Sequence, residues 1–122
     1  MMSFNFEQVA RIAYLAVKAL AEASGDLNTP DWDDAPEKDR LRAINGVTMY
    51  VANPHSGPEA THNRWMAEKK ADGWTYGPEK HEVLKEHPLL VPFEKLEPHQ
   101  QMKNIMFCDI VASLRHLIKL PF

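Results

Sequence analysis

The second half of the fold depends on three neighbouring stretches, Thr61-His62-Asn63-Arg64-Trp65, Gly73-Trp74-Thr75-Tyr76-Gly77 and Lys85-Glu86-His87-Pro88-Leu89-Leu90-Val91-Pro92-Phe93. Residues 61–93 contain two tryptophans, one tyrosine, three prolines, two glycines and three histidines. So many prolines and glycines prevent a single regular helix across this region. Two interpretations follow: a rigid loop that closes a core, or a preformed pocket whose aromatic faces and cations suit a planar anionic ligand.

Size and composition limit the class of protein. A chain of 122 residues with 44% apolar and 25% charged residues is typical of one folded domain, which we place at residues 1–122. The net charge of −3 argues against nucleic-acid binding, which favours a basic surface. The single cysteine, Cys108, fits a reducing compartment and sits in an apolar helical pattern typical of a buried, inert thiol. No signal peptide or membrane span is apparent, so we expect a cytoplasmic protein without a membrane partner.

The hydrophobic periodicity predicts four helices, near residues 5–23, 36–53, 58–72 and 98–119. Gly25 is expected to end the first helix in a left-handed conformation, and Trp32 should dock on the core. Gly46 indicates close packing, and Ser56 to Glu59 resembles a capping box. A short helical turn is expected near residues 79–85. The predicted fold class is mainly α: a four-helix domain with a long structured loop, in which the helices of residues 5–54 belong to the same domain.

Several well-known catalytic and metal-binding patterns are missing from the sequence. The five glycines are scattered singly, so no phosphate-binding glycine loop is present, and His81-Glu82 lacks the second histidine of a zinc protease motif. The histidines do not have zinc-ligand spacing, and the acidic loop around Asp31 lacks the glycine and glutamate of a calcium loop. We therefore expect no metal, no cofactor and no catalytic residues. An enzyme that uses His62, His87 and Asp72 for acid–base chemistry is the least favoured alternative.

Aromatic and basic side chains gather in the predicted third helix and the loop after it. Bases stack on tryptophan, and phosphates prefer lysine, arginine and backbone amides. The candidate ligand-binding residues are His62, Arg64, Trp65, Lys69, Lys70, Trp74, Tyr76, Lys85 and His87.

Each candidate also has a purely structural interpretation. Trp74 and Tyr76 lie between glycines and are expected to plug the loop into the core. A histidine such as His62 is more often a hydrogen-bonded packing residue than a catalyst. Lys69 and Lys70 can be a solvated helix end. The turn that contains Lys85 and His87 can simply set the direction of the loop. Trp65 follows an arginine on a helix with an expected wet face, so it carries the functional hypothesis.

The spacing of these residues resembles the ryanodine receptor repeat, or RyR domain. The pattern runs from His62-x-x-Trp65 through Gly73-Trp74-x-Tyr76-Gly77 and Lys85-x-His87-Pro88 to Leu90-Val91-Pro92-Phe93, and it covers about residues 58–114. Upstream, Trp32-x-x-Ala35-Pro36, Arg40, Gly46-Val47 and Asn53-Pro54 are similar to small prokaryotic or viral single-repeat members. His81 and Asn104 depart from the pattern, because acidic residues are common at both places.

The resemblance carries expectations about structure and function. It implies a mainly α fold with short extended segments in the loop. Repeats of this family occur in tandem pairs with pseudo-two-fold symmetry, so a lone repeat is expected to form a homodimer. Tandem modules are associated with adenine nucleotides at the tryptophan of the His-x-x-Trp pattern, which is Trp65 here. The resulting hypothesis is a non-catalytic module that senses or sequesters a nucleotide or nucleotide-derived molecule; the alternative is a protein-interaction or dimerisation module without a small ligand.

Overall fold

The computed structural model describes residues 2–119, which form a mainly helical fold as predicted. The helices are α1 (Phe6–Ala23), α2 (Glu37–Ala52), α3 (Pro58–Ala71) and α4 (Pro98–Leu114). Two short strands, β1 (Thr75–Tyr76) and β2 (Glu86–His87), lie in the loop between α3 and α4. Three 3₁₀ turns complete the elements: η1 (Trp32–Asp34), η2 (Phe93–Lys95) and η3 (Arg115–Leu117).

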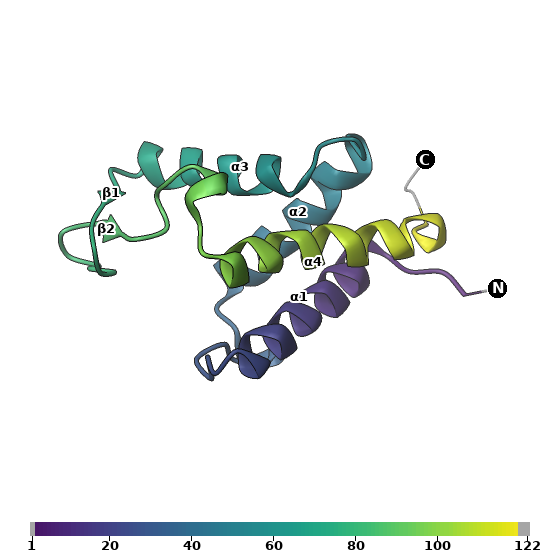
Figure 1. Ribbon diagram of the computed structural model, residues 1–122. Coiled ribbons are helices and arrows are strands. Elements are labelled where there is room, and N and C mark those ends of the chain that lie inside the picture. The colour runs from purple at the N-terminus through teal and green to yellow at the C-terminus, as the bar shows by residue number, and fades with distance from the viewer. Residues whose placement is uncertain (1, 120–122) are drawn as a thin grey trace.

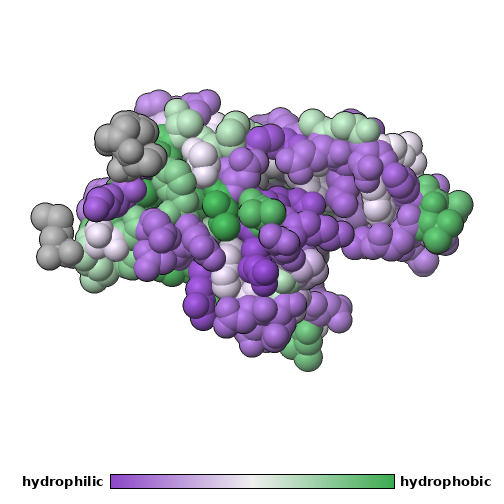
Figure 2. All heavy atoms as spheres, turned by 180° about the vertical axis from the view of Figure 1, so that it is seen from behind, coloured by the Kyte–Doolittle hydropathy of each residue, from purple (hydrophilic) through white to green (hydrophobic). Residues whose placement is uncertain are grey.

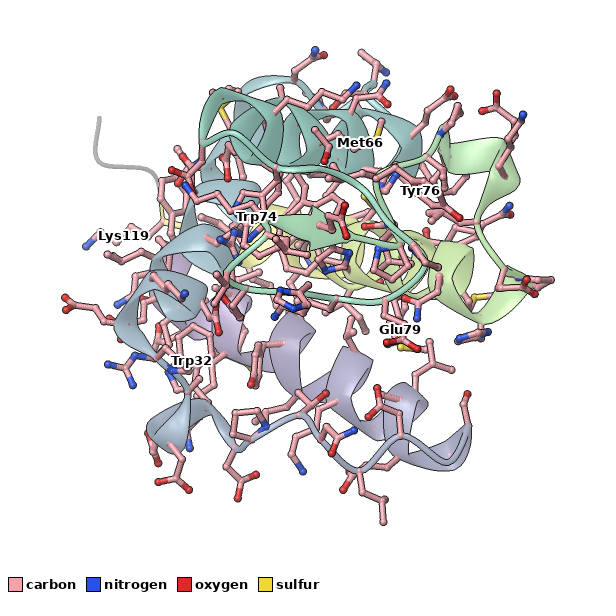
Figure 3. The ribbon with its side chains drawn as sticks, turned by 90° about the vertical axis from the view of Figure 1, so that its left-hand side faces the viewer. Trp32, Met66, Trp74, Tyr76, Glu79 and Lys119 are labelled. Atoms are coloured by element: carbon pink, nitrogen blue, oxygen red, sulfur yellow. The ribbon has the colours of Figure 1, made fainter. Side chains whose placement is uncertain are left out.

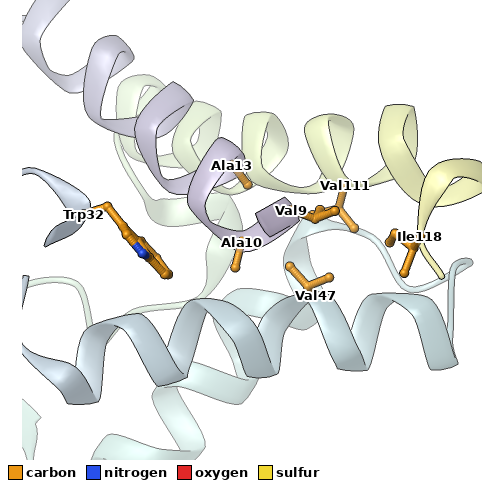
Figure 4. Close-up of a cluster of buried hydrophobic side chains, with 7 residues drawn as sticks. All are labelled: Val9, Ala10, Ala13, Trp32, Val47, Val111 and Ile118. Carbon is orange, nitrogen blue, oxygen red and sulfur yellow. The ribbon is translucent and has the colours of Figure 1, made fainter. Parts of the chain in front are cut away.

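Helix α1 lies at the centre of the packing and contacts both α2 and α4, whereas α3 packs on α4 and η2 (Figure 1). Val9, Ala10 and Ala13 of α1 are fully buried, and small alanine side chains let the neighbouring helices approach closely. Val47 of α2 and Val111 of α4 complete the centre of this cluster (Figure 4). The sequence pattern of α1 therefore determines where the other two helices can pack.

Trp32 docks on the core as predicted, with 5% of its surface exposed. Its ring makes an edge contact with Tyr14 of α1 at a centroid distance of 5.4 Å. The close packing predicted at Gly46 is also confirmed, since a Cβ there would lie 3.2 Å from the ring of Phe107 on α4. The loop between α1 and α2 is held by Arg40, whose Nη1 donates to the carbonyl of Ala35 at 2.9 Å.

The start of α2 and the capping of α3 differ from the prediction, whereas the predicted start of α3 is confirmed. Pro36 precedes α2 as its N-cap and is not its first helical residue. Helix α3 begins with Pro58 after Gly57, and no side chain caps it. The predicted capping box is wrong, because the Ser56 hydroxyl donates to the carbonyl of Asn53 at 2.8 Å and is thereby used in the preceding turn.

The ends of the first and last helices are set by the backbone. Gly25 has a φ of +94°, which confirms the predicted left-handed end of α1. Helix α4 ends at Leu114 and continues only as η3, so the predicted extension to residue 119 is wrong. Beyond that turn, Lys119 N donates to the carbonyl of Phe4 at 2.8 Å, and this pairing with the N-terminal segment requires extended backbone.

The loop between α3 and α4 contains a small parallel sheet at one end of the molecule (Figure 1). Thr75 pairs with Glu86 and Tyr76 with His87. The helical turn predicted near residues 79–85 does not form. This stretch must instead lead the chain back to the start of β2, and it does so through turns in which Lys85 has a φ of +53°.

Candidate functional site

The site begins where α3 ends. Gly73 has a φ of +88° and reverses the chain, and Trp74 N then donates to the carbonyl of Lys69 at 2.9 Å. This turn folds Trp74 back under the loop, where only 6% of its surface is exposed (Figure 3). Its indole Nε1 donates to Asp72 Oδ2 at 3.2 Å. The prediction that Trp74 plugs the loop is confirmed.

Tyr76 does not plug the loop, so that prediction is wrong. Its side chain is 59% exposed, and both residues of β1 are exposed. The two-stranded sheet stands at the end of the molecule, and Tyr76 points away from Trp74 (Figure 3). Gly77 therefore marks a tight strand pairing and not a buried tyrosine, because a Cβ on Gly77 would lie 2.6 Å from the Cβ of Glu86.

Four rings form an aromatic cluster, which we define as His62, Trp65, Trp74 and His87. His62 is 4% exposed and its Nε2 donates to the carbonyl of Val91 at 2.7 Å, which holds the loop against α3. Its ring stacks on Trp65 at 5.6 Å with an angle of 23° between the planes. His87 approaches Trp65 at 5.0 Å and Trp74 at 6.2 Å, both edge-on. The cluster fixes Trp65 while leaving its indole half-buried.

His87 has a defined hydrogen-bonding state. Its Nδ1 accepts a hydrogen bond from the backbone N–H of Leu89 at 3.1 Å, so the neutral ring carries its proton on Nε2. Burial lowers the pKa of His87 from its ordinary value, and the positive charges of Lys80 and Lys69 lower it further. The ring is therefore a neutral donor at neutral pH.

Trp65 forms part of the wall of a groove of about 610 Å³, a volume suited to a small organic molecule. We call it the tryptophan groove. Helices α1, α2, α3 and α4 and the loop before α4 all contribute to it, and its residues include Tyr14, Arg42, Gly46, His62, Arg64, Trp65, Glu68, His87, Leu96, Gln100, Asn104 and Phe107. Its walls offer an aromatic face, apolar side chains and amides that can both donate and accept hydrogen bonds.

A second cavity of about 540 Å³ shares Trp65 and His87 with the tryptophan groove. We call it the lysine chamber. Its cations are Lys38, Arg42, Lys69, Lys80 and Lys85, and Trp74 and Asp72 also line it. Lys69 Nζ lies 4.5 Å from the centre of the Trp74 ring, within cation–π distance. Asp39, Arg42, Trp65 and His87 line both cavities, so the groove and the chamber adjoin along one edge.

The candidate residues are divided between the two cavities. His62 and Arg64 line the tryptophan groove, Lys69, Trp74 and Lys85 line the lysine chamber, and Trp65 and His87 line both. Two candidates lie elsewhere: Lys70 and Tyr76 are exposed and line neither cavity. Lys70 is directed to solvent because it follows Lys69 by one residue and so faces a different side of α3.

Sequence reasoning missed the contribution of α2 and α4. Lys38 and Arg42 come from α2 and reach the chamber only because α2 packs beside the loop. Asn104 is different, since its departure from the family pattern had marked it, and it lines the tryptophan groove. His81, the other departure, accepts the N–H of Leu84 on its Nδ1 at 3.1 Å, a role that a carboxylate can also fill.

The proposed acid–base residues all have structural partners. His62 bonds to Val91, His87 accepts from Leu89, and Asp72 accepts from Trp74 and pairs with Lys85 Nζ at 3.5 Å. Cys108 is buried as predicted, and burial raises the pKa of its thiol.

Residues 2–119 contain neither a metal-binding cluster nor a membrane-spanning helix. No group of three or more histidine, cysteine or acidic side chains is placed to hold a metal ion in that part of the chain. None of the helices described there is long and apolar enough to cross a membrane.

The family comparison matches the part of the chain that carries the aromatic cluster. The model of the RyR domain matches residues 52–121, which is more than half of the chain. The match includes α3, the loop with both strands, and α4, whereas Lys38 and Arg42 of α2 precede it. This chain belongs to the RyR domain family.

Proposed function

We propose that this protein is a non-catalytic binding module that holds a nucleotide or a nucleotide-derived molecule, as a sensor or as a sequestering protein. Family membership supports a binding or interaction module. The observation that carries the finer proposal is the position of Trp65: a half-buried indole, fixed by two histidines, lies where the tryptophan groove meets the cationic lysine chamber.

The chemistry of the groove suits a planar ring. His62 covers part of Trp65 by stacking, and the indole surface that remains is available to a base at the groove. Stacking of a base on an aromatic side chain contributes about 1–3 kcal/mol. Gln100 and Asn104 on α4 bring side-chain amides to the same groove, where they can pair with the polar edge of a base.

Two finer assignments accompany this proposal. The first is that this chain is of the small prokaryotic or viral single-repeat type. It has the upstream residues of that type, and two of them have structural roles: Arg40 holds the loop before α2, and Gly46 packs against Phe107. A lone buried cysteine suits a reducing compartment, which supports a cytoplasmic location.

Thermal-shift screening against mono-, di- and cyclic nucleotides tests the proposal, because a ligand that binds only the folded state raises the melting temperature by mass action. Trp65→Leu and Trp65→Phe are matched variants: both fill the space, but only phenylalanine keeps an aromatic face. The wild type should respond, the phenylalanine variant should respond weakly, and the leucine variant should not respond. A wild type that no nucleotide stabilises contradicts the proposal.

The alternative is a protein-interaction or dimerisation module, and one surface favours it. Tyr76, Val83 and Leu84 are exposed by 59%, 86% and 62% at the loop end of the molecule, where hydrophobic atoms reach the surface (Figure 2). Sedimentation of the wild type and of a Val83→Ser/Leu84→Ser variant tests this function. A dimer that the double substitution dissociates supports it, and a monomer at high concentration counts against self-association.

A further inference from the structure

The lysine chamber holds more positive than negative charge. Five cationic side chains line it, against the three carboxylates of Asp39, Asp72 and Glu82, so the lining carries an excess of two positive charges. His87 adds no charge in its neutral form. A cavity with this balance attracts an anion, and the attraction is greatest where the cations lack partners.

Most of these cations are already paired. Lys80 Nζ lies 3.4 Å from Glu82, and Lys85 Nζ lies 3.5 Å from Asp72 Oδ1 and donates to the Asp72 carbonyl at 2.7 Å. Arg42 pairs with Asp39 at 3.1 Å.

Lys38 and Lys69 are the exceptions. Within residues 2–119, neither has a carboxylate oxygen within 4.0 Å of its ammonium group.

Lys69 is the centre of this unpaired charge. Burial lowers the pKa of its ammonium group, and the charges of Arg42 and Lys80 lower it further. Its ammonium group lies 4.5 Å from the centre of the Trp74 ring, and the charge of Glu82 offsets only part of the lowering of its pKa. An anion beside Lys69 would relieve both the loss of hydration and the repulsion between the cations.

The chamber is aligned with the tryptophan groove. Trp65 and Lys69 are four residues apart on α3, so their side chains lie on one face of the helix, about 6 Å apart along its axis. A ligand whose ring contacts Trp65 can therefore place a second group, joined to that ring through one sugar, beside Lys69. His87 stands at the junction, and its Nε2–H has no partner among the described residues, so it can donate to that group.

We propose that the lysine chamber is a subsite for a terminal phosphate, and that the protein selects a phosphomonoester over a nucleoside or a cyclic phosphodiester. This rests on the proposed function, in which the ring of the same ligand meets Trp65. A phosphomonoester carries up to two negative charges near pH 7, which matches the excess of two positive charges in the lining of the chamber. A cyclic phosphodiester carries one charge, and its ring constrains the phosphate beside the sugar.

Calorimetric titration tests the subsite with three probes for each common base: the nucleoside, its 5′-monophosphate and its 3′,5′-cyclic monophosphate. The monophosphate should bind at least about tenfold more tightly than the other two, as expected for one charge-assisted hydrogen bond. Lys69→Met, which keeps the unbranched stem over Trp74, should remove this preference by lowering the affinity for the monophosphate to that for the nucleoside. Lys70→Met is the matched control on the exposed side of α3 and should keep the preference.

The outcomes separate the subsite from the proposed function. Equal affinity for nucleoside, cyclic and 5′-monophosphate overturns the subsite and leaves the ring-binding function standing. If no nucleoside or nucleotide binds, the ring-binding function fails, and ribose 5-phosphate decides the subsite alone. Stabilisation of the wild type and of Lys70→Met, but not of Lys69→Met, by that sugar phosphate supports the subsite; no stabilisation of the wild type overturns it.

Discussion

Replacing His62 with leucine should destabilise the protein through one hydrogen bond and one ring contact. The bond from His62 Nε2 to the Val91 carbonyl measures 2.7 Å and joins α3 to the loop. Losing it leaves a part-buried carbonyl unpaired, at a cost of about 1 kcal/mol or more. Losing the stacked contact with Trp65 costs about 0.5–1.5 kcal/mol. The sum is about 2 kcal/mol, or roughly 8 °C in melting temperature for a domain of this size.

His62→Gln is the matched control, because its side-chain amide can still donate to Val91 but cannot stack as an imidazole does. It should lose only the ring contact, so it should be about 1 kcal/mol more stable than His62→Leu. Urea denaturation followed by far-ultraviolet circular dichroism measures both variants. Equal midpoints for the two variants would refute the role assigned to the hydrogen bond, and equal midpoints for both variants and the wild type would refute the whole argument.

Three other substitutions probe the loop. Gly77→Ala should weaken the strand pairing by about 1–3 kcal/mol, because its Cβ would lie 2.6 Å from the Cβ of Glu86; an unchanged melting temperature would contradict this contact. His87→Asn keeps an acceptor for the Leu89 N–H but cannot titrate. Since the folded pKa of His87 lies below its unfolded value of about 6.5, the wild type should lose stability relative to this variant as the pH falls below about 6.5, and parallel pH profiles in urea would sink that assignment. Tyr76→Ser should change stability by less than about 0.5 kcal/mol, because the ring is 59% exposed; a larger thermal shift would show that the ring is packed.

The helical part of the fold could be predicted because its signals are local. Alanine spacing in α1, the proline that opens α4 and the glycine after α1 each act within a few residues. Docking of Trp32 was also predictable, since exposing a large apolar ring to water is unfavourable.

Short extended segments in the loop were expected from the family resemblance, and β1 and β2 confirm them, but local signals could not predict how they pair. Nothing in a two-residue strand shows which face will be covered, and so the exposure of Tyr76 was not foreseen. The capping box failed for a similar reason, because the Ser56 hydroxyl had a closer acceptor in the preceding turn.

The part of the candidate site that α3 and its loop supply could be predicted from the sequence, but the part that α2 supplies could not. The stretch from His62 to His87 placed Trp65, Lys69 and Lys85 at the cavities because α3 and its loop are contiguous in the chain. Lys38 and Arg42 come from another helix, and only the packing of α2 beside the loop brings them to the chamber. The unpaired charge of Lys69 likewise depends on which carboxylates other elements supply.

The indole N–H signals of the three tryptophans give the most direct test of the central claim, that a nucleotide ring meets Trp65. Each signal can be assigned in a proton–nitrogen correlation spectrum with Trp→Phe variants. On titration with 5′-monophosphates, the Trp65 signal should shift in a saturable way and the Trp74 signal should follow, because these two line the cavities. The Trp32 signal should stay in place, since that ring lines neither cavity. A Trp65 signal that no nucleotide moves would contradict the account.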